Sequence, residues 1–342
     1  MTQKIDILNI VLVVISFFLA LVLPVRLFLF SYAVLGPLHY LTEIGWLEKR
    51  NYFSRKKSDV WILGILCGIL TIGYFLAQLD FIDPSGNTAS ISWMEPILEI
   101  NQYAGAGIVF FAFVSALAMV FIRTVRIRYG IIVLGGIAAL FIHHIQPVYL
   151  LFGLFVPTII HVSIFTGLFM LYGALKAKSV WGYIAVALFT LGCLAIFQIE
   201  ISPKLVGAKT DDLQRLLDST FIHIGASLSE FLGMRAKGDD YLLMTTLGLQ
   251  IQMLFSFCYT YHYLNWFSKT KIINWHEVSK RWLWLTGIIW IASISLYSIN
   301  YKLGFLALFF LSMLHVFLEF PLNGLSIAGI YQEIRGRIVR PT

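Results

Sequence analysis

The sequence predicts an all-α integral membrane protein, a polytopic helix bundle with about ten transmembrane helices. Hydrophobic residues make up 59% of the 342 residues, charged residues only 13%, and the mean hydropathy is +0.82. A soluble domain carries about 25% charged residues. The apolar residues also fall into runs of about 20, the length that crosses a bilayer as a helix. Finally, most positive charges lie in short segments between these runs.

The ten expected helices follow one another with short polar connections. They are placed near residues 7–23, 27–46, 60–79, 104–122, 130–146, 148–174, 180–200, 241–264, 282–299 and 303–320. The first follows Met1-Thr2-Gln3-Lys4 without a small-x-small cleavage site, so we expect a membrane helix and not a cleaved signal. The last two are separated only by Asn300-Tyr301-Lys302, which predicts a tight antiparallel pair.

The basic residues between the runs predict the orientation. One side collects 18 of the 25 Lys and Arg residues: Lys4, the 49–57 cluster, Arg123, Arg126, Arg128, Lys176, Lys178, Lys269, Lys271, Lys280, Arg281, Arg335, Arg337 and Arg340. Because cytoplasmic loops carry the excess of positive charge, both termini are expected in the cytoplasm, in a prokaryotic inner membrane. The net charge of +7 is then explained by topology, and no nucleic-acid partner is expected.

Two longer segments are expected on the opposite side. Residues 80–103 are acidic and rich in turn formers, and residues 201–240 contain an amphipathic start at Asp211-Asp212. No repeat or change in composition marks a boundary, so residues 1–342 are expected to form a single transmembrane domain. The three cysteines are far apart in sequence and provide no CxxC pair.

Two His-x-x-x-Glu turns are the most informative motifs. His39 and Glu43 end the second run, and His315 and Glu319 end the last one. Residues four apart lie on the same face of a helix, and ionisable groups inside a membrane are costly unless they face the bundle interior. The two turns therefore predict a metal or proton-handling site inside the bundle. The alternative is a pair of structural, hydrogen-bonded polar contacts.

Two further histidines complete the predicted site. The expected topology places His262 at the inner level with His39 and His315, and His161 near the middle of its span. Imidazole is the commonest metal ligand, and iron accepts it together with carboxylate. We therefore predict His39, His161, His262 and His315 as metal ligands.

Three further side chains are expected to support these ligands. Glu43 and Glu319 are expected to ligate the metal or to orient the histidine on their own helix. Tyr261 or Asn265 is expected to accept the second N–H of His262, because metal-bound histidines normally donate it to a partner. The Tyr and Trp residues around His262 also suit an interfacial aromatic belt.

The segment Gly36-Pro37-Leu38-His39-Tyr40-Leu41-Thr42-Glu43 resembles the Gly-x-Pro-His-Gly-Ala-x-Asp motif of the bacterial and archaeal membrane-bound β-carotene dioxygenases (the Brp/Blh family). The aromatic approach to His262, from Phe255 to Tyr261, is similar to the C-terminal histidine region of that family. The resemblance implies a helical bundle that holds one non-haem iron by histidines, with His39 and His262 among the ligands. It also implies a carotenoid-like substrate that enters from the bilayer.

These observations predict an O₂-dependent metalloenzyme. We expect an Fe(II) oxygenase, a dioxygenase or hydroxylase, that acts on a lipid-soluble substrate such as a carotenoid, isoprenoid or acyl chain, with O₂ and membrane lipids as further partners. Another transition metal is the alternative cofactor. A proton-coupled transporter that uses buried His and Glu is the main alternative function, and a lipid-modifying transferase is the third. Walker, GxGxxG, HExxH and GxSxG motifs are absent from the sequence, which argues against nucleotide-driven chemistry, zinc proteolysis and serine hydrolysis.

Overall fold

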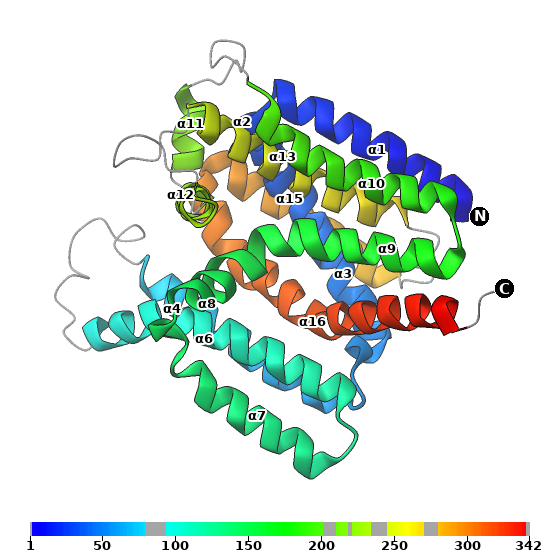
Figure 1. Ribbon diagram of the computed structural model, residues 1–342. Coiled ribbons are helices and arrows are strands. Elements are labelled where there is room, and N and C mark those ends of the chain that lie inside the picture. Colours follow the sequence, from blue (N-terminus) through cyan, green and yellow to red (C-terminus); the bar gives the residue numbers. More distant parts are fainter. Residues whose placement is uncertain are drawn as a thin grey trace. The chain divides into compact units, whose positions relative to one another are not determined.

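The computed structural model describes residues 2–78, 94–200, 210–217, 221–233, 245–269 and 280–339. All regular structure in these ranges is helical, which confirms the predicted all-α class there (Figure 1). In order, the elements are α1 (Thr2–Val22), α2 (Pro24–Phe30), η1 (Ser31–Leu35), α3 (Gly36–Lys49), η2 (Asn51–Phe53), η3 (Lys57–Val60), α4 (Trp61–Leu76), α6 (Met94–Phe121), α7 (Val125–Ala139), η5 (Ile142–His144), α8 (Gln146–Leu150), η6 (Leu151–Phe165), α9 (Thr166–Ala177), α10 (Val180–Ala195), η7 (Ile196–Gln198), α11 (Thr210–Leu217), α12 (Phe221–Phe231), α13 (Thr246–Ser268), α15 (Lys280–Ile299) and α16 (Tyr301–Val339).

Each of the ten predicted spans overlaps with helical structure in the described residues, but fewer helices meet the requirements for crossing a membrane. Seven helical segments of the described chain are long and apolar enough: Gln3–Val22, Pro24–Lys49, Ala104–Phe121, Gln146–Ala177, Val180–Gln198, Lys280–Ile299 and Tyr301–Gly336. Helices α4 and α7 have only 16 and 15 residues. Helix α13 is long but carries many polar side chains. An integral membrane protein is therefore supported, whereas the count of ten and the cytoplasmic termini stay predictions.

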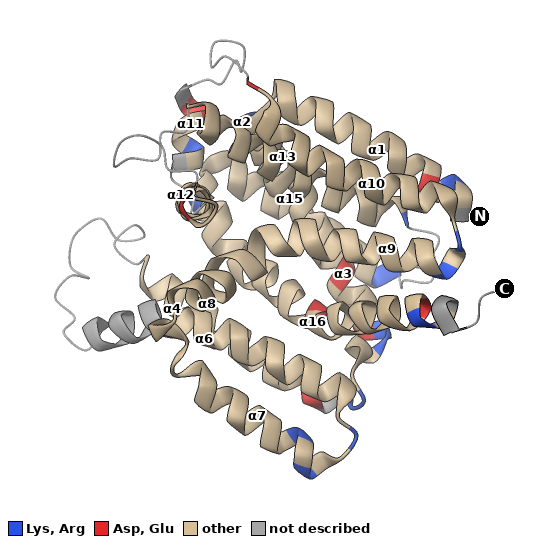
Figure 2. Cartoon of the chain, in the orientation of Figure 1, with Lys and Arg blue, Asp and Glu red and all other residues tan. Residues whose placement is uncertain are grey.

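Charged residues lie mainly near helix ends and connections (Figure 2). The predicted amphipathic start at Asp211-Asp212 is the first turn of α11. Within the predicted 80–103 segment, residues 80–93 lie outside the described part of the chain. Helix α6 begins at Met94.

The chain divides into two compact units. The first comprises Met1–Thr42, Ile159–Phe305 and Ser326–Thr342, and the second comprises Glu43–Thr158 and Leu306–Leu325. The chain passes between the units inside α3, η6 and α16. The single transmembrane domain expected from the sequence stays a prediction.

Helix α13 forms the centre of the first unit. Every residue from Gly248 to Tyr263 is buried, and the helix packs against α1, α2, α10 and α12. A helix that is buried on all sides has no solvent-exposed face, so α13 has no apolar stripe opposite a polar one. The packing of α10 on α13 also places the sulfur atoms of Cys193 and Cys258 3.7 Å apart. Their separation in the sequence gave no indication of this contact.

Two π-helical segments lie close to histidines of the first unit: η1 precedes His39, and η6 contains His161. The π-helix η1 ends at Leu35, and the Gly36 N–H bonds to the Ser31 carbonyl oxygen, five residues back. Pro37 follows directly, and η6 contains Pro157. Proline lacks an N–H and clashes with the preceding turn, so a locally widened helix accommodates it. His39 and His161 lie two and four residues after these prolines.

The turn between α9 and α10 is set by two adjacent residues. Lys178 adopts the left-handed conformation, with φ 50° and ψ 39°, which ends α9. Ser179 then caps α10, because its Oγ accepts a hydrogen bond from the Gly182 N–H at 3.2 Å. The two helices leave this turn in close contact.

Gly182 is expected to be required for that contact. A Cβ at Gly182 would lie 2.8 Å from the Ala174 Cβ, whereas a Cβ at Gly287 would meet nothing within 4 Å. We expect Gly182→Ala to lower the free energy of unfolding by about 1–3 kcal/mol relative to Gly287→Ala, because overpacking forces the helices apart. Thermal unfolding of both variants in detergent measures the difference. Equal midpoints would contradict the close approach.

The second unit contains a buried ion pair. Arg128, at the start of α7, lies with Nη1 3.2 Å from Oδ2 of Asp59 in η3, and their side chains are only 3% and 8% exposed. Helices α4, α6 and α7 pack together in this unit. The pair ties the basic end of α7 to the start of α4.

Candidate metal centre

Three buried histidines from three separate elements meet in the first unit. His39 lies in α3, His161 in η6 and His262 in α13, and they are 1%, 3% and 7% exposed. One ring nitrogen from each lies within 4.8 Å of the others, so the three can hold a metal ion. The structure thus brings together three of the four histidines predicted as ligands.

The closest contact within the cluster joins Nε2 of His262 to Nε2 of His39, at 3.0 Å. Two nitrogens that each lie about 2.1 Å from one ion are about 3.0 Å apart when they subtend 90°, and about 3.4 Å apart in a tetrahedral site. The observed distance therefore lies near the range expected for two ligands of one ion. It also suits a hydrogen bond between two neutral imidazoles.

Thr166 supports His262 from the other side of the ring. Its Oγ1 lies 2.7 Å from Nδ1 of His262, and both residues are buried. When Nδ1 carries the proton and donates it to this hydroxyl, Nε2 keeps its lone pair and faces His39. The sequence did not point to Thr166, because a single hydroxyl in an apolar run gives no sign of a partner 96 residues away.

Aromatic side chains hold the ring of His39. Its centroid lies 5.1 Å from that of Tyr263 and 5.5 Å from that of Trp266. The Trp266 indole N–H donates to Oγ1 of Thr42 at 3.0 Å, which links α13 to α3 directly beside the histidine. A Cβ at Gly36 would lie 3.1 Å from the Tyr263 hydroxyl, so glycine permits this close approach. These contacts leave the imidazole little freedom to move.

Tyr261 lies in the same helix but points elsewhere. It is fully buried, and its hydroxyl lies 3.2 Å from Oδ1 of Asn9 and 3.3 Å from Sδ of Met170. The residue found at Nδ1 of His262 is Thr166 and not Tyr261. Tyr261 instead connects α13 to α1 and α9.

The second unit contains the remaining predicted site residues. Glu43, His315 and Glu319 are 3%, 5% and 2% exposed. A carboxylate oxygen of Glu43 and a ring nitrogen of His315 lie within 4.8 Å of each other. A role for these three residues as ligands or orienting groups stays a prediction. Of the other histidines, His143, His144 and His223 lie outside both groups, and His276 lies outside the described residues.

Comparison with protein-family models, with curated proteins and with solved structures finds no match to this chain. The resemblance to the membrane-bound β-carotene dioxygenases therefore stays a prediction carried by the residues around His39 and His262.

Proposed function

We propose that this protein is a membrane-embedded metalloenzyme, a non-haem iron oxygenase that acts on a lipid-soluble substrate. The observation that carries the proposal is the 3.0 Å separation of two buried imidazole nitrogens, with a third histidine in the same cluster. Iron accepts imidazole ligands, and His39, His161 and His262 would hold it. Bound iron would supply the electron transfer by which O₂ reacts with the substrate.

The chain itself contributes three things to this chemistry. His39, His161 and His262 offer ring nitrogens as ligands in a buried position. Thr166 forms a hydrogen bond with Nδ1 of His262, and Trp266 and Tyr263 restrain His39. The surrounding helices exclude bulk water, which protects a reactive oxidant from side reactions.

The nature of the substrate follows from the surroundings of the cluster. His39 and His161 belong to helical segments that are apolar and long enough to span a bilayer. A substrate that reaches them between helices must itself dissolve in the bilayer. A carotenoid, isoprenoid or acyl chain has this property, and O₂ is also more soluble in lipid than in water.

Metal analysis of the purified protein is the direct test. We expect near-stoichiometric iron and, after exchange into Co(II), the weak visible absorption of a six-coordinate ion. Strong absorption bands would indicate a tetrahedral site, which would favour zinc chemistry over the oxygenase. Protein without any bound transition metal, after loading attempts with Fe(II) and Co(II), would refute the proposal.

The second candidate is a proton-coupled transporter. The same 3.0 Å contact, followed by the 2.7 Å contact to Thr166, forms a continuous His39–His262–Thr166 chain that can pass a proton. Buried histidines are equally expected in such a relay. Transport of protons into proteoliposomes by metal-free protein would favour this function.

A further inference from the structure

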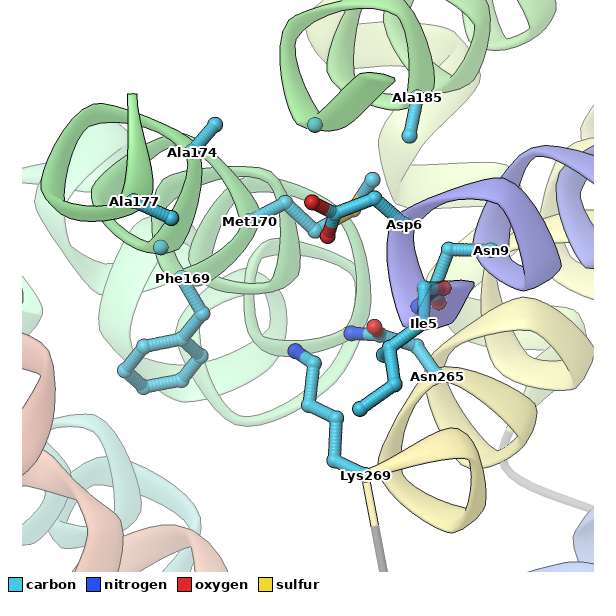
Figure 3. A pocket seen from close by; sticks show the side chains of 12 residues that line it. Ile5, Asp6, Asn9, Phe169, Met170, Ala174, Ala177, Ala185, Asn265 and Lys269 are labelled. Carbon is cyan, nitrogen blue, oxygen red and sulfur yellow. Dashed lines mark hydrogen bonds between the residues drawn. The ribbon is translucent and has the colours of Figure 1, made fainter. Parts of the chain in front are cut away.

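A small cavity in the first unit has charged and polar side chains in a mostly apolar lining. Its volume is about 120 Å³, and its lining includes Asp6 and Asn9 of α1, Met170 of α9, and Asn265 and Lys269 at the end of α13. Figure 3 shows the Asp6 carboxylate, the Lys269 ammonium group and the Asn265 amide directed into the same space. This volume exceeds what a single water molecule needs, so the cavity has room for water.

The charges in this cavity require solvation. Asp6 accepts a hydrogen bond from the Ser179 hydroxyl at 2.5 Å. Burial lowers the pKa of Lys269 to about 8, while the negative charge of Asp6 acts in the opposite direction. Two opposite charges at the edge of an apolar bundle are stabilised when water joins them.

Asn265 provides independent evidence of a bound donor. Its side chain is 6% exposed, and its Oδ1 has no hydrogen-bond partner among the described residues. A buried amide oxygen without a donor has lost its hydrogen bond to water without a replacement, which is unfavourable. The cavity that this residue lines is where such a donor would be placed.

The cavity ends about one helical turn from the metal centre. Asn265 follows His262 by three residues on α13, and Met170 follows Thr166 by four on α9. Residues at these spacings are neighbours on a helix face. Thr166 and His262 are themselves joined at 2.7 Å. The other end reaches the surface, since Ala177 in the lining is exposed and Lys269 is half-buried.

We propose that this cavity holds water and is the route by which protons from the aqueous phase reach the histidine centre. Lys269 and Asp6 act at its mouth as proton-exchanging groups, and Asn265 orients the water nearest to His262. When a two-electron donor drives hydroxylation, one oxygen atom enters the substrate and the other is released as water with the uptake of two protons, and a site enclosed in apolar helices needs a route for these protons. The proton role rests on the proposed oxygenase function, whereas the hydration of the cavity does not.

Cysteine labelling tests hydration. In full-length protein with Cys67, Cys193 and Cys258 replaced by alanine, Ala174→Cys and Ala185→Cys each place a thiol in the lining. Ala20→Cys is the matched control, because Ala20 is also buried but is not part of the lining. Iodoacetamide reacts with the thiolate, which forms only where water can stabilise its charge. We expect the two cavity thiols to react at least about 10-fold faster than the control. Rates equal to the control would overturn the inference.

Oxygen consumption tests the proton role. With ascorbate as the reductant, iron-loaded protein takes up two protons for each O₂ reduced to hydrogen peroxide. We expect Lys269→Met and Asp6→Asn to slow this reaction at least about 10-fold with unchanged iron content, and to increase its solvent deuterium isotope effect. Lys4→Met removes an exposed positive charge from α1 and should keep the normal rate. If Lys269→Met and Asp6→Asn match Lys4→Met, the proton role is wrong. If iron does not bind at all, the proposed function and the proton role fail together, and the labelling rates still decide whether the cavity is wet.

Discussion

His262→Ala is expected to remove the metal from the purified protein and to abolish O₂-dependent turnover. The imidazole of His262 is in contact with both His39 and Thr166, and its ring centroid lies 4.8 Å from that of His161. The substitution would remove one ligand from the cluster, at the histidine that lies next to both of the other two. Because a ligand contributes directly to metal affinity, we expect a loss of more than about 100-fold, beyond the range of an outer-shell partner. Metal content and a thermal unfolding midpoint are measured on the same sample.

Thr166→Val distinguishes a ligand from its support. Valine keeps the shape of threonine but cannot accept the N–H of His262, so we expect metal affinity to fall by about 10–100-fold. Tyr261→Phe is the control, since its hydroxyl contacts Asn9 and Met170 and not the imidazole. Retention of full metal content in His262→Ala, with normal folding, would exclude His262 as a ligand.

Asp59→Ala is expected to have the largest effect on stability. The substitution would leave Arg128 buried, at 3% exposure, without its carboxylate. Breaking a buried pair by removing one partner costs about 3–5 kcal/mol, because the remaining charge stays desolvated. We expect a correspondingly large fall in the thermal unfolding midpoint in detergent, without a change in the metal affinity of the histidine cluster.

Two controls identify burial as the cause. The Arg26–Asp212 pair has a shorter distance of 2.7 Å, but Arg26 is 38% exposed. Asp212→Ala should therefore cost only about 0–1 kcal/mol. Replacing both members of the buried pair, as in Asp59→Leu with Arg128→Met, should recover most of the loss. A double variant as unstable as Asp59→Ala would mean that packing, and not the charge, stabilises this region.

The sequence could predict which polar side chains face inward, because a histidine in an apolar run has no favourable place in lipid. That reasoning identified His39, His161 and His262, and the structure brings them together. It could not identify Thr166. Threonine is tolerated on any face of a membrane helix, so its position carries no information about its partner.

The hydropathy pattern also could not predict the lengths of the helices. Apolar runs continue across the ends of α4 and α7, so hydropathy alone suggested full spans where the helices have 16 and 15 residues. Helix α13 is buried on every side, so its sequence lacks the one-sided apolar pattern by which a helix is usually recognised. Likewise, the 3.7 Å approach of Cys193 and Cys258 depends on how α10 packs on α13, which no local motif encodes.

The π-helical segment η1 makes the orientation of His39 depend on an extra residue in the chain. A widened turn behaves as a single-residue insertion in an α-helix, and each residue of an α-helix advances the side-chain direction by about 100°. Removing one residue between Ser31 and Leu35 would let the turn close into regular α-helix. The part of α3 that follows would then rotate relative to α2 by about that angle, carrying His39 away from His262. The angular phase of the helix, and not only the presence of the histidine, is therefore part of what this sequence must preserve.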